Sequence, residues 1–121
     1  MLKVYVAGPI RDKNVVQIFK NLGVGIETAA RLVKLGYAPF CPFIDFQYLL
    51  TPAGSSITVE ELQKYSLEWL KSCDVVLLLP GHEKSKGVKA EIKCAAECAI
   101  PVVDSIKQLR KYEDITGWMH V

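Results

Sequence analysis

The sequence contains few of the residues that hold metals or form covalent cross-links. Its 121 residues include four cysteines and two histidines. They form neither a CxxC pair nor a Cys/His cluster with zinc-ligand spacing. No metal site and no cofactor is expected. We expect the cysteines to be reduced thiols that lie mostly in the core, as free cysteines commonly do; they are Cys41, Cys73, Cys94 and Cys98.

A concentrated basic region is also absent. The formal net charge is only +2, and the lysines and arginines are dispersed rather than gathered into a block that follows a phosphate backbone. Large nucleic acid is therefore not expected as a partner. A small anionic ligand remains compatible with this distribution of charge.

No apolar run is long enough to cross a membrane. Beyond the N-terminus the longest run is Val75–Pro80, whereas a transmembrane helix needs about 20 apolar residues. The apolar start, Met1–Gly8, is short and is stopped by Gly8 and Pro9, so it lacks the form of a signal peptide. These features predict a cytoplasmic protein without a membrane partner.

What the sequence does contain is enough apolar surface for a core. Half of its residues are hydrophobic, and we expect one domain over residues 1–121. Short apolar and β-branched runs predict four strands, at residues 2–7, 37–42, 74–79 and 101–103. Helical patterns alternate with them, at residues 15–34, 58–72, 87–99 and 105–112.

Local signals refine these elements. Thr58 and Glu61 form a capping-box pattern, and Asp104 is the expected N-cap of the last helix. Gly23 and Gly25 weaken the middle of the first helix, each by about 1 kcal/mol relative to Ala. Residues 43–57 are expected to form a long loop, and long loops in compact domains are often functional or mobile.

The alternation of strands and helices predicts the fold class. We expect an α/β domain of three layers, in which helices cover both faces of a doubly wound, flavodoxin-like parallel sheet of four to five strands. The continuous apolar run at residues 74–79 belongs at the centre of such a sheet. Pro39 and Pro42 place the strand at residues 37–42 at an edge or a strand end.

Ligands bind at the carboxyl ends of the strands in such sheets, which directs attention to the loops Gly8–Arg11 and Pro80–Gly87. The second loop leads into a helix N-terminus, which suits a phosphate or carboxylate. Glu91 follows about one turn later, where the helix dipole favours its ionised form. Its carboxylate could attack an anomeric carbon, as in retaining glycosidases. On spacing alone, a solvated partner of Lys89 or Lys93 is the more frequent role.

The first loop and its strand leave comparable alternatives open. Tyr5 is either a core aromatic with a satisfied hydroxyl or a group at the site, and the first case is the commoner one. Arg11 either binds a phosphate or lies exposed. Gly8 and Pro9 either approach a ligand or only form a turn.

Three segments stand in an order that resembles a known superfamily. They are Val4–Ile10, Ser66–Val76 and Ser85–Glu91. Together they resemble the nucleoside 2-deoxyribosyltransferase superfamily over nearly the whole chain. The resemblance is greatest to its nucleotide N-glycosidases and to a branch of small phage and bacterial proteins with a Leu-Pro-Gly stretch after the third strand.

This resemblance implies a role for each matching residue. Glu91 would be the nucleophile that attacks C1′ and forms a glycosyl-enzyme, and Tyr5 would orient Glu91 or contact the sugar. Ser85 and Gly87 resemble the phosphate-binding serine and glycine of the monophosphate hydrolases. The transferases tend to carry an acidic residue where this chain has Ser85, so the serine favours a 5′-monophosphate substrate. Further substrate-binding residues would be Gly8, Pro9, Ile10, Arg11 and Ser66.

The resemblance also implies a homodimer or a higher homo-oligomer, since sites of this family are often completed by a neighbouring subunit. The apolar C-terminal segment with Trp118 and Met119 fits that expectation.

Ser66 is a departure from the family pattern. Family members often carry an aspartate there, which helps to protonate the leaving base, and serine cannot act as a general acid at neutral pH. Glu61, Glu68 or Asp45 could take over that task, whereas Asp74 at the amino end of a strand is expected to be structural.

Three functions follow as hypotheses. The first is an N-glycosidase that hydrolyses a (deoxy)ribonucleoside 5′-monophosphate. The second is a deoxyribosyltransferase, in which a second base resolves the glycosyl-enzyme. The third is a module that binds a nucleotide without cleaving it. In each case the partner is a small-molecule nucleotide or nucleoside.

Overall fold

The computed structural model describes residues 1–117 and contains a four-stranded parallel sheet. Trp118 and Met119, which the sequence analysis linked to an oligomer contact, lie outside the described residues. The order of the strands across the sheet is β2-β1-β3-β4. Their bounds are β1 (Lys3–Ala7), β2 (Ala38–Phe40), β3 (Val75–Leu78) and β4 (Val102–Val103).

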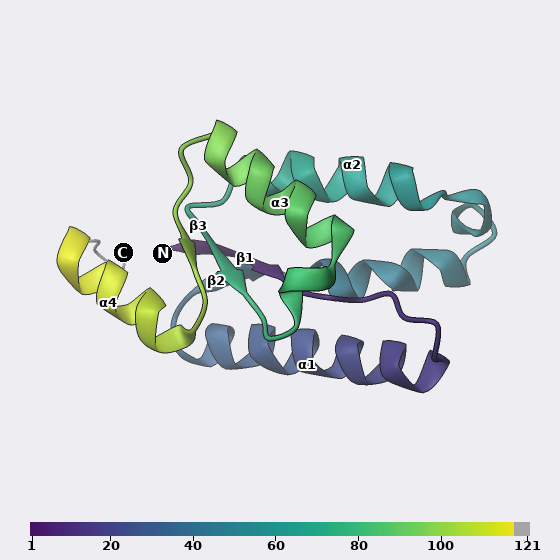
Figure 1. Cartoon of the computed structure of the whole chain (residues 1–121), viewed down its shortest axis with the longest axis horizontal. Helices are drawn as coiled ribbons and strands as arrows, with labels where there is room; N and C mark the ends of the chain where they lie inside the picture. Colours follow the sequence, from purple (N-terminus) through teal and green to yellow (C-terminus); the bar gives the residue numbers. More distant parts are fainter. Residues whose placement is uncertain (118–121) are drawn as a thin grey trace.

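Helices cover both faces of this sheet (Figure 1). On one face lie α2 and α3, and on the other lie α1 and α4. The helix bounds are α1 (Val15–Lys34), α2 (Val59–Leu70), α3 (Lys86–Glu97) and α4 (Ile106–Thr116). The three-layer, flavodoxin-like α/β fold expected from the sequence is therefore confirmed, with four strands in the sheet.

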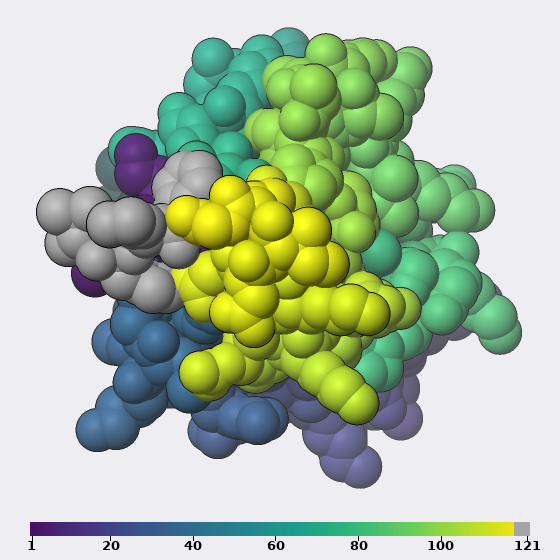
Figure 2. All heavy atoms as spheres, turned by 90° about the vertical axis from the view of Figure 1, so that its left-hand side faces the viewer, coloured from purple at the N-terminus to yellow at the C-terminus, as the bar shows by residue number. Residues whose placement is uncertain are grey.

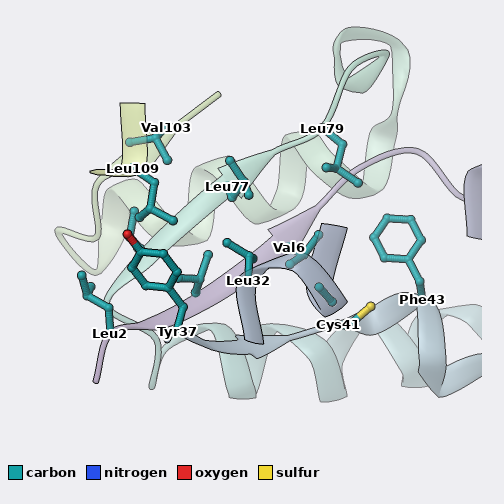
Figure 3. Packing of buried hydrophobic residues seen from close by; sticks show 13 residues of the cluster. Leu2, Val6, Leu32, Tyr37, Cys41, Phe43, Leu77, Leu79, Val103 and Leu109 are labelled. Atoms are coloured by element: carbon teal, nitrogen blue, oxygen red, sulfur yellow. The ribbon is translucent and has the colours of Figure 1, made fainter. Parts of the chain in front are cut away.

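The core consists of two clusters separated by the sheet. Because successive side chains of a strand point to opposite faces, Val4 and Val6 of β1 pack toward α1 and α4, while Tyr5 and Ala7 pack toward α2 and α3. Figure 3 shows the first cluster, in which Leu109 lies close to Val103 and Tyr37 at one end. The sheet is thus apolar on both sides, which fixes its register against the helices.

The positions of the strands agree with their composition. The apolar strand β3 lies between β1 and β4, and the proline-containing β2 lies at an edge, both as expected. From β1 the chain passes through α1 to β2 on one side, whereas from β3 it passes through α3 to β4 on the other. The loops after β1 and β3 therefore diverge, which makes the gap between them the switch point of the sheet.

The two ends of the sheet have different surroundings. Figure 2 views the end that lies on the left of Figure 1, and α4, in yellow, occupies the middle of this face. The arrows of β1 and β3 in Figure 1 point away from it. The carboxyl ends of these strands are consequently at the other end of the molecule.

The segment between β2 and α2 differs from the expected loop. It forms two 3₁₀ helices, η1 (Pro42–Leu50) and η2 (Gly54–Ser56). The anchor of η1 is Phe43, which is buried in the core cluster against α1. Sequence periodicity did not indicate this because short 3₁₀ turns have a period near three and carry little amphipathic signal.

The helix caps were predicted in part. The capping box of α2 is present, since the Thr58 hydroxyl accepts from the Glu61 backbone N–H and the Glu61 side chain accepts from that of Thr58. For α4 the expectation was wrong: Ser105 rather than Asp104 is the N-cap, and its hydroxyl accepts from Gln108. The Asp104 backbone N–H instead donates to the Gln108 side chain.

All four cysteines are free thiols. Cys41 and Cys94 are buried as expected, Cys73 is partly buried, and Cys98 is exposed because it follows the last turn of α3. Within residues 1–117, no helix combines the length and the apolar character that crossing a membrane requires.

The two glycines inside α1 have different surroundings. Gly23 is exposed, and a Cβ added there would meet nothing within 4 Å. Gly25 is buried, and a Cβ added there would lie 2.3 Å from the ring of Phe43. Glycine at position 25 thus allows η1 to approach the helix, whereas position 23 carries only the cost in helix propensity.

We predict opposite effects for the two alanine substitutions. Gly23→Ala should raise the free energy of unfolding by about 0.5–1 kcal/mol, because alanine is the better helix former. Gly25→Ala should lower it by about 1–3 kcal/mol, because the added methyl group displaces Phe43. Urea denaturation of the two variants measures both effects. Equal stabilisation by both would contradict the close packing of η1 on α1.

Candidate functional site

A cavity of about 1110 Å³ lies at the carboxyl ends of β1 and β3. Its walls come from the loop after β1, the loop after β3, the start of α3, one face of α2 and the helix η1. The volume lies just above the usual range for small-molecule sites, about 300–1,000 Å³. The residues predicted from the sequence that line it are Gly8, Pro9, Ile10, Arg11, Ser66, Ser85, Gly87 and Glu91.

Glu91 lies in α3, about one turn beyond Gly87, and its carboxylate accepts a hydrogen bond from the Tyr5 hydroxyl. Tyr5 comes from the middle of β1, 86 residues away in the sequence. The ion pairs between described residues are Lys71–Glu68 and His82–Glu83. The alternative role of Glu91, a solvated partner of Lys89 or Lys93, is therefore not adopted.

Burial controls the ionisation of Glu91. Desolvation raises its pKa from 4.5 to about 7, while the hydrogen bond from Tyr5 acts in the other direction because it stabilises the charged form. From the sequence, the dipole of the helix was expected to keep this group ionised. The structure corrects this expectation, because the carboxyl is shared between its two protonation states near neutral pH.

Tyr5 is held rigidly beneath Glu91. Its side chain is fully buried, and its ring stacks on Phe40 of β2 with the centroids 5.6 Å apart. Burial, followed by the nearby charge of Glu91, raises the pKa of Tyr5 well above its ordinary value, so the phenol stays protonated and acts as a donor. Ser66 of α2 opposes this shift through a side-chain hydrogen bond to Tyr5.

The N-terminus of α3 forms another wall of the cavity. The Ser85 side chain is the N-cap of this helix and accepts from the Val88 backbone N–H. A hydroxyl that accepts there still has its own hydrogen to donate. A Cβ added to Gly87 would lie 3.7 Å from the Gln63 amide nitrogen. The side chain of Gln63 on α2 is therefore close to the start of α3. Together with Lys84 and Lys86, which also line the cavity, this wall suits an anion.

The loop after β1 is fixed from both sides. A Cβ on Gly8 would lie 2.8 Å from the side chain of Leu79, so glycine permits the ends of β1 and β3 to pack together. The Asn21 side chain of α1 donates to the backbone oxygen of Ile10 at 3.2 Å. Arg11 is exposed at the rim of the cavity. The loop thus supplies a packed wall and one exposed cation.

The helix η1 supplies the apolar wall together with a single carboxyl group. Phe43, Phe46 and Leu49 line the cavity from this helix, and so does Asp45. Its Oδ2 atom is buried and has no hydrogen-bond partner, and burial raises the pKa of the Asp45 carboxyl. An acid thus lies among apolar and aromatic side chains of the same cavity that contains Glu91.

Sequence reasoning missed several residues of this site. Gln63 was not singled out, although its spacing of three from Ser66 places both on one face of α2. Lys84 and Lys86 flank Ser85 in the sequence but were not among the predicted site residues. Asp45 was considered, but nothing in the sequence placed it, because the course of η1 depends on the contact of Phe43 with α1.

The other acidic candidates are accounted for elsewhere. The side chain of Glu61 caps α2, and Glu68 pairs with Lys71 at 3.2 Å. Neither belongs to the lining of the cavity. Across residues 1–117, no three His, Cys, Asp or Glu side chains cluster as metal ligands would.

Comparisons with known proteins give a family and a fold. Residues 2–104 match the family described as "Domain of unknown function (DUF4406)". No curated protein matches the chain.

Among solved structures, the chain is similar to a 2-deoxyribosyltransferase from the psychrotolerant bacterium Bacillus psychrosaccharolyticus, described as a suitable biocatalyst for the industrial synthesis of antiviral and antitumoral nucleosides. The two are 20% identical with a TM-score of 0.61, over 83% of this chain and 69% of that one. At this identity, the similarity shows a shared fold.

The raised pKa of Glu91 predicts a pH-dependent gain in stability for Glu91→Gln. The folded chain holds the Glu91 proton up to about pH 7, whereas the unfolded chain releases it near 4.5, so this group lowers stability as the pH rises between these values. At pH 8.5 the neutral amide should raise the free energy of unfolding by up to about 3 kcal/mol. At pH 4.5 it should change little.

Denaturant titrations at the two pH values measure this difference. Glu97→Gln is the matched control, because Glu97 is exposed on the same helix and should show no such dependence. A gain from Glu91→Gln that is equal at both pH values would argue against a buried charge at this position.

Proposed function

This chain belongs to the DUF4406 family of domains of unknown function, and we propose that its site breaks the N-glycosidic bond of a nucleoside or nucleotide. The observation that carries the proposal is Glu91, which lines the cavity at the ends of β1 and β3 and accepts a hydrogen bond from the buried Tyr5 behind it. A partly buried carboxylate with a fixed phenol donor is suited to form a bond to an anomeric carbon.

The chemistry assigned to the pair has two steps. In the first, a carboxylate oxygen of Glu91 attacks C1′ of the sugar while the bond from C1′ to the base breaks. In the second, an acceptor attacks C1′ and releases Glu91. Tyr5 orients the carboxylate through its hydrogen bond, and the stack on Phe40 keeps the phenol in place. The fixed geometry lowers the entropic part of the barrier.

A 5′-phosphate is the group that best fits the start of α3. Ser85 and Gly87 offer a hydroxyl and a backbone that a ligand can approach closely, and the helix N-terminus favours an anion. Lys84, Lys86 and Arg11 add positive charge around the same cavity. This arrangement favours a nucleoside 5′-monophosphate over an uncharged nucleoside.

The acceptor in the second step distinguishes two activities. The similar fold belongs to a 2-deoxyribosyltransferase, which favours transfer of the sugar to a second base. Hydrolysis of a 5′-monophosphate is the second candidate, and Ser85 at the start of α3 is the feature that favours it. We place base exchange ahead of hydrolysis because a solved structure of the same fold supports it.

A third possibility is a module that binds the nucleotide without cleaving it. Ser66 motivates this possibility, because a serine cannot donate a proton to the base as an aspartate does. In such a module Glu91→Ala would leave affinity for the nucleotide nearly unchanged, and the unsubstituted protein would release no base.

The test is incubation of the purified protein with a panel of ribo- and deoxyribonucleosides and their 5′-monophosphates, with and without a free second base. We expect release of base from a monophosphate, and base exchange when the second base is present. Glu91→Gln should reduce the rate by about a thousandfold or more, because the amide cannot act as the nucleophile. Chromatography of the products gives the rates.

Glu97→Gln serves as the control and should retain the rate of the unsubstituted protein. Mass spectrometry with a slowly released 2-fluoro-2-deoxy nucleotide should find the sugar phosphate attached to Glu91. No base release from the whole panel, with nucleotide still bound, would favour the binding module and count against catalysis.

The raised pKa of Glu91 predicts the acid side of the pH profile. The attack needs the ionised carboxylate, so kcat/KM should fall about tenfold per pH unit below about 7, the pKa to which burial raises this group. Initial rates between pH 5 and 8 test this expectation. A profile that stays flat down to pH 5 would exclude Glu91 as the group that must lose its proton.

A further inference from the structure

Cleavage of an N-glycosidic bond leaves a negative charge on the base unless a proton reaches it. The residue at position 66 is a serine, which does not supply that proton at neutral pH, and Glu91 is engaged at the sugar. We propose that Asp45 is the catalytic acid that protonates the departing base. This inference rests on the proposed function and names the residue that completes it.

The position of Asp45 fits the base rather than the phosphate. The two lysines that line the cavity, Lys84 and Lys86, flank Ser85 at the start of α3, where Ser85 is the helix cap. The wall formed by η1 is apolar apart from this carboxyl group, with Phe43, Phe46 and Leu49 around it. A flat aromatic base suits such a wall, and its ring nitrogens or carbonyl oxygens then need one polar partner.

The surroundings of the carboxyl group favour its protonated form. The buried Oδ2 atom accepts no hydrogen bond, and a carboxylate is stabilised chiefly by such donors. Burial also raises the pKa of Asp45. A site built to hold an ionised carboxylate for recognition would present donors to that oxygen. The structure therefore points to a group that gives up a proton when substrate is bound.

The other carboxyl groups near the cavity are less suited. Asp12 also lines it, but Asp12 is exposed and its Oδ1 atom already accepts a hydrogen bond from the Asn14 backbone N–H. Glu61 is held in the cap of α2, and Glu68 in its ion pair with Lys71. Within residues 1–117, Asp45 is the acid that combines cavity lining with an unpartnered buried oxygen.

The step balances without any further reactant. A carboxylate oxygen of Glu91 forms a bond to C1′, and the electron pair of the C1′–N bond moves to the base. The Asp45 proton passes to the base, at N7 or N3 of a purine or O2 of a pyrimidine, and leaves Asp45 as a carboxylate. In the second step the incoming water or base forms a bond to C1′ while the ester bond to Glu91 breaks, and the Asp45 carboxylate takes the proton that this acceptor loses.

The experiment compares two kinds of leaving group in Asp45→Asn. A nucleotide with an ordinary base needs the acid, so its kcat should fall by about 100-fold or more. A 7-methylguanine nucleotide already carries a positive charge on its base, and a 4-nitrophenyl glycoside of the same sugar phosphate releases a stable anion. Neither needs a proton. For whichever of these two probes the unsubstituted protein cleaves faster, the rate of Asp45→Asn should therefore lie within about threefold of the unsubstituted rate.

Glu68→Gln is the matched control, since it removes an exposed carboxyl group from α2 and should leave both rates unchanged. Retained cleavage of the probe also shows that Asp45→Asn is folded. An equal loss on natural substrate and probe would make Asp45 a structural residue and overturn the inference, as would full activity on the natural substrate. If the unsubstituted protein cleaves neither the natural nucleotide nor the probe, the proposed function itself fails.

Discussion

The parallel pairing of β1 with β3 is the constraint on which the site depends. The two strands lie side by side with Tyr5 opposite Val76, and the chain leaves their carboxyl ends in different directions. The divergence opens a cavity that the helices do not fill. The same pairing directs alternate side chains of β1 to opposite faces, so Tyr5 points toward α3 and meets Glu91 there.

Two carboxyl groups line this cavity, and they differ in whether a hydrogen bond stabilises the ionised form. Glu91 is desolvated but receives a hydrogen bond from Tyr5, which supports its ionised form. Asp45 is desolvated among apolar side chains, and its buried oxygen receives no hydrogen bond. Differences of this kind separate an acid from a nucleophile within one site. Because burial raises both pKa values, each carboxyl group lowers the free energy of unfolding when it is ionised.

The sequence was sufficient to predict the elements that carry a hydrophobic pattern or a local capping or proline signal. Apolar runs identified β3 as central, prolines identified β2 as an edge, and the capping box of α2 was legible from Thr58 and Glu61. The sequence also brought Tyr5 and Glu91 to one sheet end through topology and a family resemblance. It was insufficient for η1, whose path is set by Phe43 packing on Gly25, a contact between residues with no shared periodicity. The place of Asp45 depends on that contact.

Ser66 then acquires a different meaning. Its hydroxyl contributes a hydrogen bond to Tyr5 that opposes the rise in pKa caused by burial, so it acts on the hydrogen-bond partner of Glu91. An aspartate at this point of α2 would bring another negative charge close to Glu91 and Tyr5, which would raise both pKa values further. Under the proposal that Asp45 on η1 is the acid, this charge is not needed. The serine and Asp45 then form one arrangement, in which protonation is assigned to the wall proposed to receive the base.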